Sequence, residues 1–217
     1  MRWGMLINLK KCAACYSCAI KCKQEHFLPP GIMWGRLLVT EEEGKYPTAK
    51  KKAYPVLCNH CTDPVCVEVC PTGATSQRED GIVWVDADKC IGCRYCLVAC
   101  PYQARSYISS TDKEYFPRQG LTDWEKIGKR LYSHKKGTVT KCNFCKERID
   151  AGLEKGLKPG IDREATPACV ITCPNKARYF GDIDDPNSEI SVLIREKRAT
   201  PLHQEYSTNP NVYYYIG

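Results

Sequence analysis

Cys90-Ile-Gly-Cys93-Arg-Tyr-Cys96-Leu-Val-Ala-Cys100-Pro101 is the stretch of this 217-residue chain that decides its fold. Three cysteines recur here at every third position, and a fourth follows four positions later, directly before a proline. Twelve further cysteines fall into three comparable groups, so none of the sixteen is left over. The other groups are Cys12, Cys15, Cys18 and Cys22; Cys58, Cys61, Cys66 and Cys70; and Cys142, Cys145, Cys169 and Cys173.

Sixteen cysteines can form disulfides or bind metal, and their spacing separates the possibilities. A disulfide framework is typical of small secreted chains that cannot build a core. This chain is long enough to bury one, and Met1-Arg-Trp-Gly4 opens no secretory signal. Zinc favours two well-separated Cys-x-x-Cys pairs. Only the last group, with 23 residues between Cys145 and Cys169, could be such a site.

A loop with the spacing Cys-x-x-Cys-x-x-Cys presents three thiolates to three corners of a cubane iron-sulfur cluster. In the bacterial ferredoxin run, in which a fourth cysteine and a proline follow, that fourth cysteine ligates the other cluster of a pair. Cys90 to Pro101 matches this run in full, whereas Cys12 to Cys22 matches its cysteines and continues with Lys23. The second group lengthens one gap to four residues, and the last group lengthens it to 23. The sequence therefore predicts four [4Fe-4S] clusters.

Crossed ligation gives a specific prediction for the ligands. Groups two and three are separated by only 19 residues, in which Gly81 to Asp86 alternates like one strand of a hairpin, so they form one ferredoxin-like unit. By elimination, the other two groups form a second unit from both ends of the chain. The predicted ligand sets are Cys58, Cys61, Cys66 and Cys100; Cys90, Cys93, Cys96 and Cys70; Cys12, Cys15, Cys18 and Cys173; and Cys142, Cys145, Cys169 and Cys22.

The predicted fold class is α+β, with two bacterial-ferredoxin-like units and long loop inserts. One unit comprises residues 58–100, and the other comprises 1–57 together with 142–217, including a C-terminal tail. Residues 101–141 form an insert that we expect to face a partner, because loops of this length in compact domains are usually functional. We also expect strands within Met5–Leu9 and Ile32–Thr40, a charged turn over Glu41–Lys52, and a polar surface insert over Lys146–Thr166.

The chain has a formal net charge of +7. A cubane held by four thiolates carries about −2, so four clusters add about −8 and nearly cancel this surplus. Basic residues beside the cysteines either compensate the clusters locally or form a solvated face; they are Lys10, Lys11, Lys21, Lys23, Lys89, Arg94, Lys141, Lys146 and Arg148. Basic residues do not alternate with aromatic ones in a stripe, and no apolar run is long enough for a membrane span, so neither nucleic-acid binding nor a membrane anchor is expected.

No catalytic pattern accompanies the cysteines. The sequence has no P-loop, no G-x-G-x-x-G fingerprint and no supported pair of nucleophile and base, so no catalytic residue is predicted. His26, His60, His134 and His203 are isolated, and we expect surface or loop positions for them. His60 lies between two predicted ligands, where its ring could donate a hydrogen bond to sulfur and raise a reduction potential.

Phrases around the cysteines carry a resemblance over essentially the full length. They include Cys58-Asn-His-Cys61, Cys70-Pro-Thr-Gly-Ala74, Asp88-Lys-Cys-Ile-Gly-Cys93, Cys100-Pro-Tyr102 and Asn209-Pro-Asn-Val-Tyr-Tyr214. With them, the chain resembles the four-cluster electron-transfer subunit of the dimethyl sulfoxide reductase family of molybdopterin oxidoreductases. It is most similar to the short soluble types of polysulfide, thiosulfate, tetrathionate and arsenate reductases or of the related transhydroxylase. All sixteen ligand positions are cysteine here, whereas some members replace one of them.

The resemblance implies a non-catalytic subunit of an anaerobic respiratory complex. A large partner would hold a molybdenum or tungsten bis-pterin guanine dinucleotide cofactor. This chain would conduct single electrons between that partner and a quinone-linked membrane subunit or a soluble carrier. Two alternatives are a free soluble polyferredoxin shuttle and a complex that turns over without net electron flow. Such subunits often cross to the periplasm with a signal-bearing partner, so we expect a periplasmic location, with the cytoplasm as the alternative.

Overall fold

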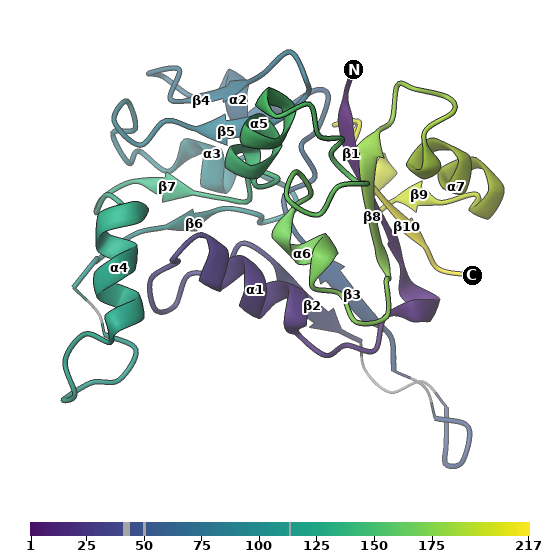
Figure 1. Cartoon of the computed structure of the whole chain (residues 1–217), viewed down its shortest axis with the longest axis horizontal. Helices are drawn as coiled ribbons and strands as arrows, with labels where there is room; N and C mark the ends of the chain where they lie inside the picture. The colour runs from purple at the N-terminus through teal and green to yellow at the C-terminus, as the bar shows by residue number, and fades with distance from the viewer. Residues whose placement is uncertain (41–43, 50, 113) are drawn as a thin grey trace.

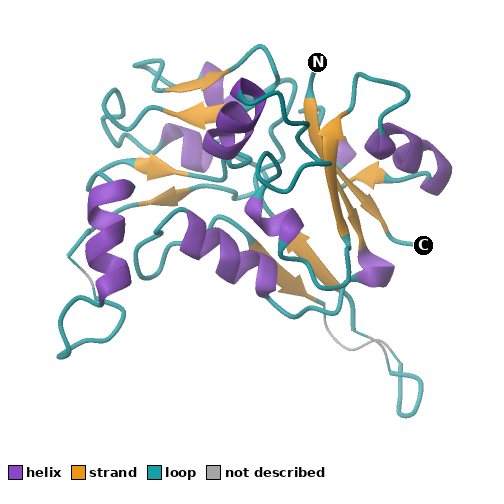
Figure 2. Cartoon of the chain, viewed as in Figure 1, coloured by secondary structure: helices purple, strands orange, loops and turns teal. Residues whose placement is uncertain are grey.

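The computed structural model describes residues 1–40, 44–49, 51–112 and 114–217 of a mixed α/β chain. Helices and strands are short, and loops connect them over much of the molecule (Figure 2). Within the described residues, the strands form one four-stranded sheet and three two-stranded sheets. This scarcity of regular structure is compatible with the predicted clusters, because bound metal can hold loops in place.

The four-stranded sheet joins the two ends of the chain. Its strands are β1 (Trp3–Asn8), β8 (Arg178–Asp182), β9 (Thr200–Pro201) and β10 (Val212–Tyr215), in the order β8-β1-β10-β9. β1 runs parallel to β10 and antiparallel to β8, so the purple N-terminal strand lies between a green and a yellow one in Figure 1. Met5 and Ile7 of β1 are fully buried, which confirms the strand expected before the first cysteine group.

The remaining strands of the described residues form three antiparallel pairs. β2 (Arg36–Val39) pairs with β3 (Ala53–Val56), β4 (Thr75–Gln77) with β5 (Val83–Val85), and β6 (Ser106–Tyr107) with β7 (Val139–Thr140). β2 and β5 confirm the strands predicted within residues 32–40 and 81–86. The charged turn expected over 41–52 lies partly outside the described residues, at positions 41–43 and 50. β6 and β7 bring the two ends of the 101–141 insert together.

Most helices follow a cysteine loop or lie in an insert. They are α1 (Ser17–Glu25), α2 (Val65–Glu68), α3 (Tyr95–Val98), α4 (Asp123–Leu131), α5 (Lys146–Glu154), α6 (Ala168–Ile171) and α7 (Glu189–Lys197), with 3-10 turns at Leu9–Lys11 and Gln204–Tyr206. The insert helix α4 begins at a capping box in which Thr122 and Glu125 satisfy each other's backbone amides. No helix in the described part of the chain is long and apolar enough to cross a membrane.

The main core includes cysteines as well as ordinary apolar side chains. Phe144, Ile7 and Tyr214 are buried in the same cluster as Cys22 and Cys142. The sequence predicts a polar surface insert over Lys146–Thr166. In the structure, only part of this insert lies at the surface. Its helix α5 buries Ile149 completely, because that side chain points away from the charged face into the core.

Candidate metal centres

All four cysteine loops share one backbone turn. The residue directly before the second cysteine of each group has a positive φ: Ala14 at 53°, His60 at 43°, Gly92 at 71° and Phe144 at 54°. Only the third of these is glycine, and the left-handed region is unfavourable for the other three. The repeat of this turn in the last group, which alone could have been a zinc site by spacing, indicates that its loop is of the same kind as the others.

A short helix follows the turn in every group. The third cysteine is always its second residue, as Cys18 is in α1, Cys66 in α2, Cys96 in α3 and Cys169 in α6. Backbone N–H groups at a helix start lack helical acceptors and favour negative charge nearby. The sequence did not predict this regularity for the last group, in which α5 and a further loop separate the second cysteine from the third.

Two cavities are each lined by three cysteines of one group and the fourth cysteine of another. Cys12, Cys15, Cys18 and Cys173 line one of them. Cys58, Cys61, Cys66 and Cys100 line the other. Burial, reinforced by the neighbouring thiols, raises the pKa of Cys61 to about 12. The shared cavity, and not the raised pKa, is what points to a metal, because ligand thiols lose their protons only when a cation binds.

In the other two predicted sets, the fourth cysteine also lies near cysteines of the group with which it was paired, whereas Cys93 stands exposed on its loop. Burial, and then repulsion from the thiols of Cys142, Cys145 and Cys169, raises the pKa of Cys22 well above its usual range. Cys96 likewise lies near Cys70 and Cys90, and burial is the largest cause of its raised pKa. No three His, Cys, Asp or Glu side chains of the described residues converge closely enough to hold a single metal ion.

Backbone amides point at several of these sulfurs. The N–H of Thr75 donates to Sγ of Cys70 at 3.3 Å, and the N–H of Ala177 donates to Sγ of Cys173 at 3.2 Å. Such donors stabilise negative charge on sulfur, and in iron-sulfur proteins they tune the reduction potential. The donors, the burial and the sets of four thiols fit a [4Fe-4S] cluster.

Two of the four histidines lie in loops, as one of the expected alternatives, but both are buried. His26 is only 3% exposed, and its Nε2 lies 3.2 Å from Sγ of Cys145. His60 is fully buried, and its Nδ1 accepts a hydrogen bond from the backbone N–H of Val83. Its Nε2 therefore carries the proton of the neutral ring and has no partner among the described residues. The sequence could not reveal the contact of His26, because 118 residues separate it from Cys145.

Of the basic residues near the cysteines in sequence, Lys141 is the buried one, with 3% exposure. Its ammonium donates to the backbone carbonyls of Val83 and Cys142. Two buried cations were missed because they lie five positions beyond a cysteine: Arg105 after Cys100 and Arg178 after Cys173. Each lines one of the two cysteine cavities described above.

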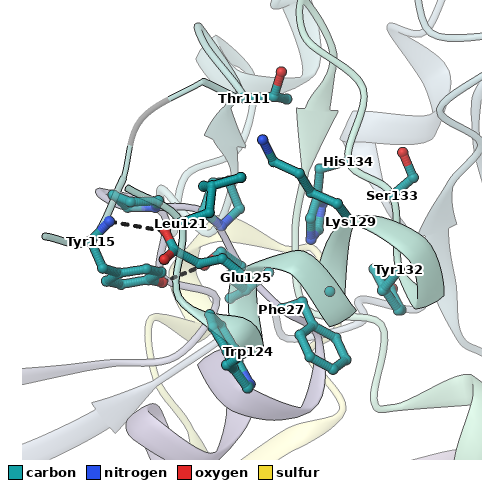
Figure 3. Close-up of a pocket in the computed structure, with 14 residues that line it drawn as sticks. Phe27, Thr111, Tyr115, Leu121, Trp124, Glu125, Lys129, Tyr132, Ser133 and His134 are labelled. Atoms are coloured by element: carbon teal, nitrogen blue, oxygen red, sulfur yellow. Dashed lines mark hydrogen bonds between the residues drawn. The ribbon is translucent and has the colours of Figure 1, made fainter. Parts of the chain in front are cut away.

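A pocket of about 260 Å³ opens between α4 and the segment that follows α1 (Figure 3). Aromatic rings of Phe27, Tyr115, Trp124 and Tyr132 line it. The carboxylate of Glu125 accepts the backbone N–H of Tyr115 at 3.0 Å, which fixes the insert over the pocket. On its inner wall, Nε2 of His134 donates to the backbone carbonyl of His26 at 2.8 Å. His134 therefore connects the pocket to His26, whose ring in turn lies beside Sγ of the predicted ligand Cys145.

Comparisons with known proteins agree with this geometry. Residues 49–115 match the model of the 4Fe-4S dicluster domain family. A selenate reductase subunit of Mesobacillus selenatarsenatis is 40% identical over 222 residues, which cover 99% of this chain and 72% of that protein. The arsenate respiratory reductase iron-sulfur subunit of Shewanella sp. is 37% identical, covering 99% of this chain and 96% of that protein. The chain belongs to the iron-sulfur electron-transfer subunits of the dimethyl sulfoxide reductase family.

A tetrathionate reductase subunit of Salmonella typhimurium is a further relative, 37% identical over 98% of this chain and 72% of that protein. As an iron-sulfur electron-transfer subunit, the chain holds [4Fe-4S] clusters and serves an oxidoreductase complex without catalysing its reaction. The full-length similarity confirms the resemblance drawn from the cysteine phrases. The matched dicluster domain covers groups two and three, whose hairpin had predicted a ferredoxin-like unit.

Proposed function

We propose that this subunit carries four [4Fe-4S] clusters on the four crossed ligand sets. Through them it would conduct single electrons between a molybdenum- or tungsten-pterin catalytic subunit and a quinone-linked membrane subunit or soluble carrier. The observation that carries the proposal is the convergence of cysteines from opposite ends of the chain. Cys173 shares a cavity with the first group, and Cys22 lies beside the last group. This exchange of fourth cysteines is what crossed ligation requires.

Two ferredoxin-like units would follow from these ligand sets, and several contacts support them. Residues 1–57 and 142–217 share the sheet of β8, β1, β10 and β9, and α1 packs against α6. Residues 58–100 contain the β4–β5 hairpin between their two cysteine groups. Cys58 and Cys142 are buried in one core and interact electrostatically, so they would be the ligands through which the two units adjoin.

A bound [4Fe-4S] cluster supplies reversible one-electron exchange without a change of ligands. The chain's own residues would fix where and how easily that exchange occurs. The amides of Thr75 and Ala177 donate to cysteine sulfur, and the buried walls exclude water. The positive φ before each second cysteine turns the loop so that its thiols face one space. Prolines after Cys70, Cys100 and Cys173 fix the turn that leaves each site.

The insert of residues 101–141 would face the partner. Its helix α4 exposes Ile127 by 41% and Leu131 by 73%, and Phe116 nearby is 54% exposed. Such apolar side chains on one element favour a covered surface over one left to solvent. The two ends of the insert are not exposed in this way, because Arg105 near its start and Val139 near its end are buried. Only the middle of the insert is therefore proposed as the contact.

The partner proposal draws on the relatives' names, which are those of subunits of selenate, arsenate and tetrathionate reductases. A large catalytic subunit would hold the pterin cofactor and choose the substrate. We also propose that the complex lies in the periplasm, exported with a signal-bearing partner. Fractionation of the native cells tests this location, and recovery of the complex only from the cytoplasm would contradict it.

The ligand sets are tested by anaerobic iron and sulfide analysis together with cysteine-to-serine variants. Four clusters predict about sixteen irons and sixteen sulfides per chain. Cys22→Ser and Cys145→Ser should alter the same electron paramagnetic resonance signal, and Cys18→Ser a different one. If Cys22→Ser instead alters the signal affected by Cys18→Ser, each group binds its own cluster and the crossed sets are wrong.

The partner is tested by gel filtration of the native protein. Co-elution with a much larger molybdenum or tungsten protein supports the subunit proposal. Elution of all the native chain near its own mass of 24.6 kDa would instead support a free shuttle. Oxidation of chemically reduced clusters when the catalytic subunit's electron-accepting substrate is added to the purified complex then tests electron transfer directly.

A further inference from the structure

The six-residue pattern Cys-Pro-x-x-Ala-Arg occurs twice, at Cys100–Arg105 and at Cys173–Arg178. Both arginine side chains are buried, with residue exposures of 7% for Arg105 and 6% for Arg178. Both follow the fourth cysteine of a group, so the same local turn carries each guanidinium back toward the cysteines. Because the same six-residue pattern ends at both arginines, the same local backbone structure accounts for their burial in both places.

The two arginines have equivalent sulfur neighbours. Arg105 interacts with Cys66 and Cys58 of one ligand set and with Cys96 of another. Arg178 interacts with Cys18 and Cys173 of one ligand set and with Cys169 of another, whose Sγ lies 3.7 Å from its Nη1. Each guanidinium therefore lies between the third cysteines of two groups. If the proposed ligand sets hold, each lies between the two clusters of one unit.

Neither guanidinium has a carboxylate partner among the described residues. Nη1 of Arg105 donates to Oγ1 of Thr75 at 3.3 Å, and its buried Nη2 has no hydrogen-bond partner. Nη1 of Arg178 points at sulfur, with Sδ of Met5 at 3.3 Å. A buried cation without a counter-charge is strongly unfavourable, so these positions require negative charge that the side chains around them do not supply.

We propose that Arg105 and Arg178 are paired electrostatic positioning residues, each raising the reduction potentials of the two clusters between which it lies. The inference rests on the proposed ligand sets. Each added electron makes a cluster more negative, and a fixed neighbouring cation favours that reduced state. Because one guanidinium is shared, it acts on both clusters of its unit and leaves the other unit's clusters unchanged. Arginine suits this role because it stays charged when buried.

The test is potentiometric titration of the cluster signals in the purified full-length protein, in wild type and four variants. Arg105→Met and Arg178→Met remove the charge while keeping an unbranched apolar chain, and Arg105→Lys and Arg178→Lys retain it. Each methionine variant should lower two potentials by at least a tenfold change in the reduction equilibrium, which is about 59 mV for one electron. Arg105→Met and Arg178→Met should each lower the potentials of a different pair of clusters. Each lysine variant should restore most of the shift.

The matched control is Arg195→Met, which removes the same charge from an exposed position on α7. It should shift none of the four potentials. Unchanged potentials in both methionine variants, or one common shift of all four, would overturn the inference. If a methionine variant fails to retain clusters, retention in the lysine variant supports a requirement for charge, and loss in both indicates a purely structural role. A wild-type protein without four clusters would instead refute the proposed function itself.

Discussion

Nε2 of His26 lies 3.2 Å from Sγ of Cys145 in the buried interior of the molecule. The histidine ring also packs on Trp34, with ring centroids 4.4 Å apart. Burial lowers the pKa of His26 to about 4, so the ring is neutral at pH 7 and has one N–H to donate. His26 is thus placed to donate that N–H to a cysteine sulfur, in a manner that favours added negative charge there.

We predict that His26→Phe lowers the potential of one cluster, the one held by the set that includes Cys145. Phenylalanine preserves the packing against Trp34 but cannot donate to sulfur. A lost hydrogen bond to a charged group corresponds to about one tenfold change in the reduction equilibrium, or about 59 mV. Potentiometric titration measures the shift. The control His203→Phe alters an exposed ring and should leave all potentials unchanged; equal potentials in both variants would refute the role.

A second prediction concerns the backbone turn at Gly92. Its φ is +71°, and a Cβ placed there would lie 2.0 Å from the backbone carbonyl oxygen of Gly137. Gly92→Ala must therefore displace the 90–96 loop or the β6–β7 region. We expect loss of about one cluster, seen as a fall in iron content by about four irons per chain.

Gly73→Ala is the matched control for Gly92→Ala. Gly73 also has a positive φ, +64°, but nothing lies within 4 Å of an added Cβ. It should incur only the left-handed strain of about 1 kcal/mol and keep its iron. Equal iron in both variants would show that the close approach to Gly137 can be relieved without cost to the site.

The positions that sequence could predict are those set by local spacing. The strand before Cys12 and the hairpin before Cys90 could be predicted because strand alternation and loop chemistry are local. The sequence also predicted that Cys173 lies beside the first group and Cys22 beside the last, because a known cysteine run implies it.

The remaining features depend on contacts between distant segments. His26 and Cys145 are 119 positions apart, and Arg178 meets Met5 across 173 positions. No spacing rule relates such pairs, since chain topology brings them together. One signal was available: Cys-Pro-x-x-Ala-Arg is repeated in the sequence, and searching for residues shared by the groups beyond their cysteines would have found both arginines.

A third prediction concerns the contact between Arg78 and Asp150. Arg78, which follows β4, forms a bidentate pair with Asp150 of α5 at 2.8 and 2.7 Å. The guanidinium holds the pKa of Asp150 below its ordinary value of 3.8. The pair therefore stabilises the fold fully above that ordinary value, and the contribution is lost as pH falls through the depressed pKa.

We expect Asp150→Asn to lower the free energy of unfolding by about 1 kcal/mol at pH 7, because the pair is partly exposed to solvent. The difference from wild type should stay constant between about pH 6 and pH 8, where Asp150 remains charged, and should shrink as added salt screens the pair. Anaerobic denaturant unfolding followed by circular dichroism, at these pH values and at low and high salt, measures it. Asp123→Asn removes an ion pair whose carboxylate is 92% exposed and should have little effect. A difference that high salt leaves unchanged would assign the effect to packing.

The final prediction concerns the proposed partner surface on α4. Ile127 and Leu131 are 41% and 73% exposed on a helix whose capping box already stabilises its start. Replacing both by glutamate should leave iron content and circular dichroism unchanged, because neither side chain packs in the core. Covering each side chain contributes about 1.5–3 kcal/mol, so the double variant should bind the catalytic subunit at least about tenfold more weakly.

The control for the α4 variant is the double variant Leu38→Glu, Val39→Glu, which places the same two charges on β2 at residues that are 53% and 50% exposed. If general repulsion or reduced solubility weakened the complex, both variants would weaken it alike. A loss confined to the α4 variant, measured by titration of the purified catalytic subunit with each iron-loaded chain, locates the contact on the insert. Equal affinity of the α4 variant and wild type would mean that the partner covers another face, and that Ile127 and Leu131 are exposed for local reasons.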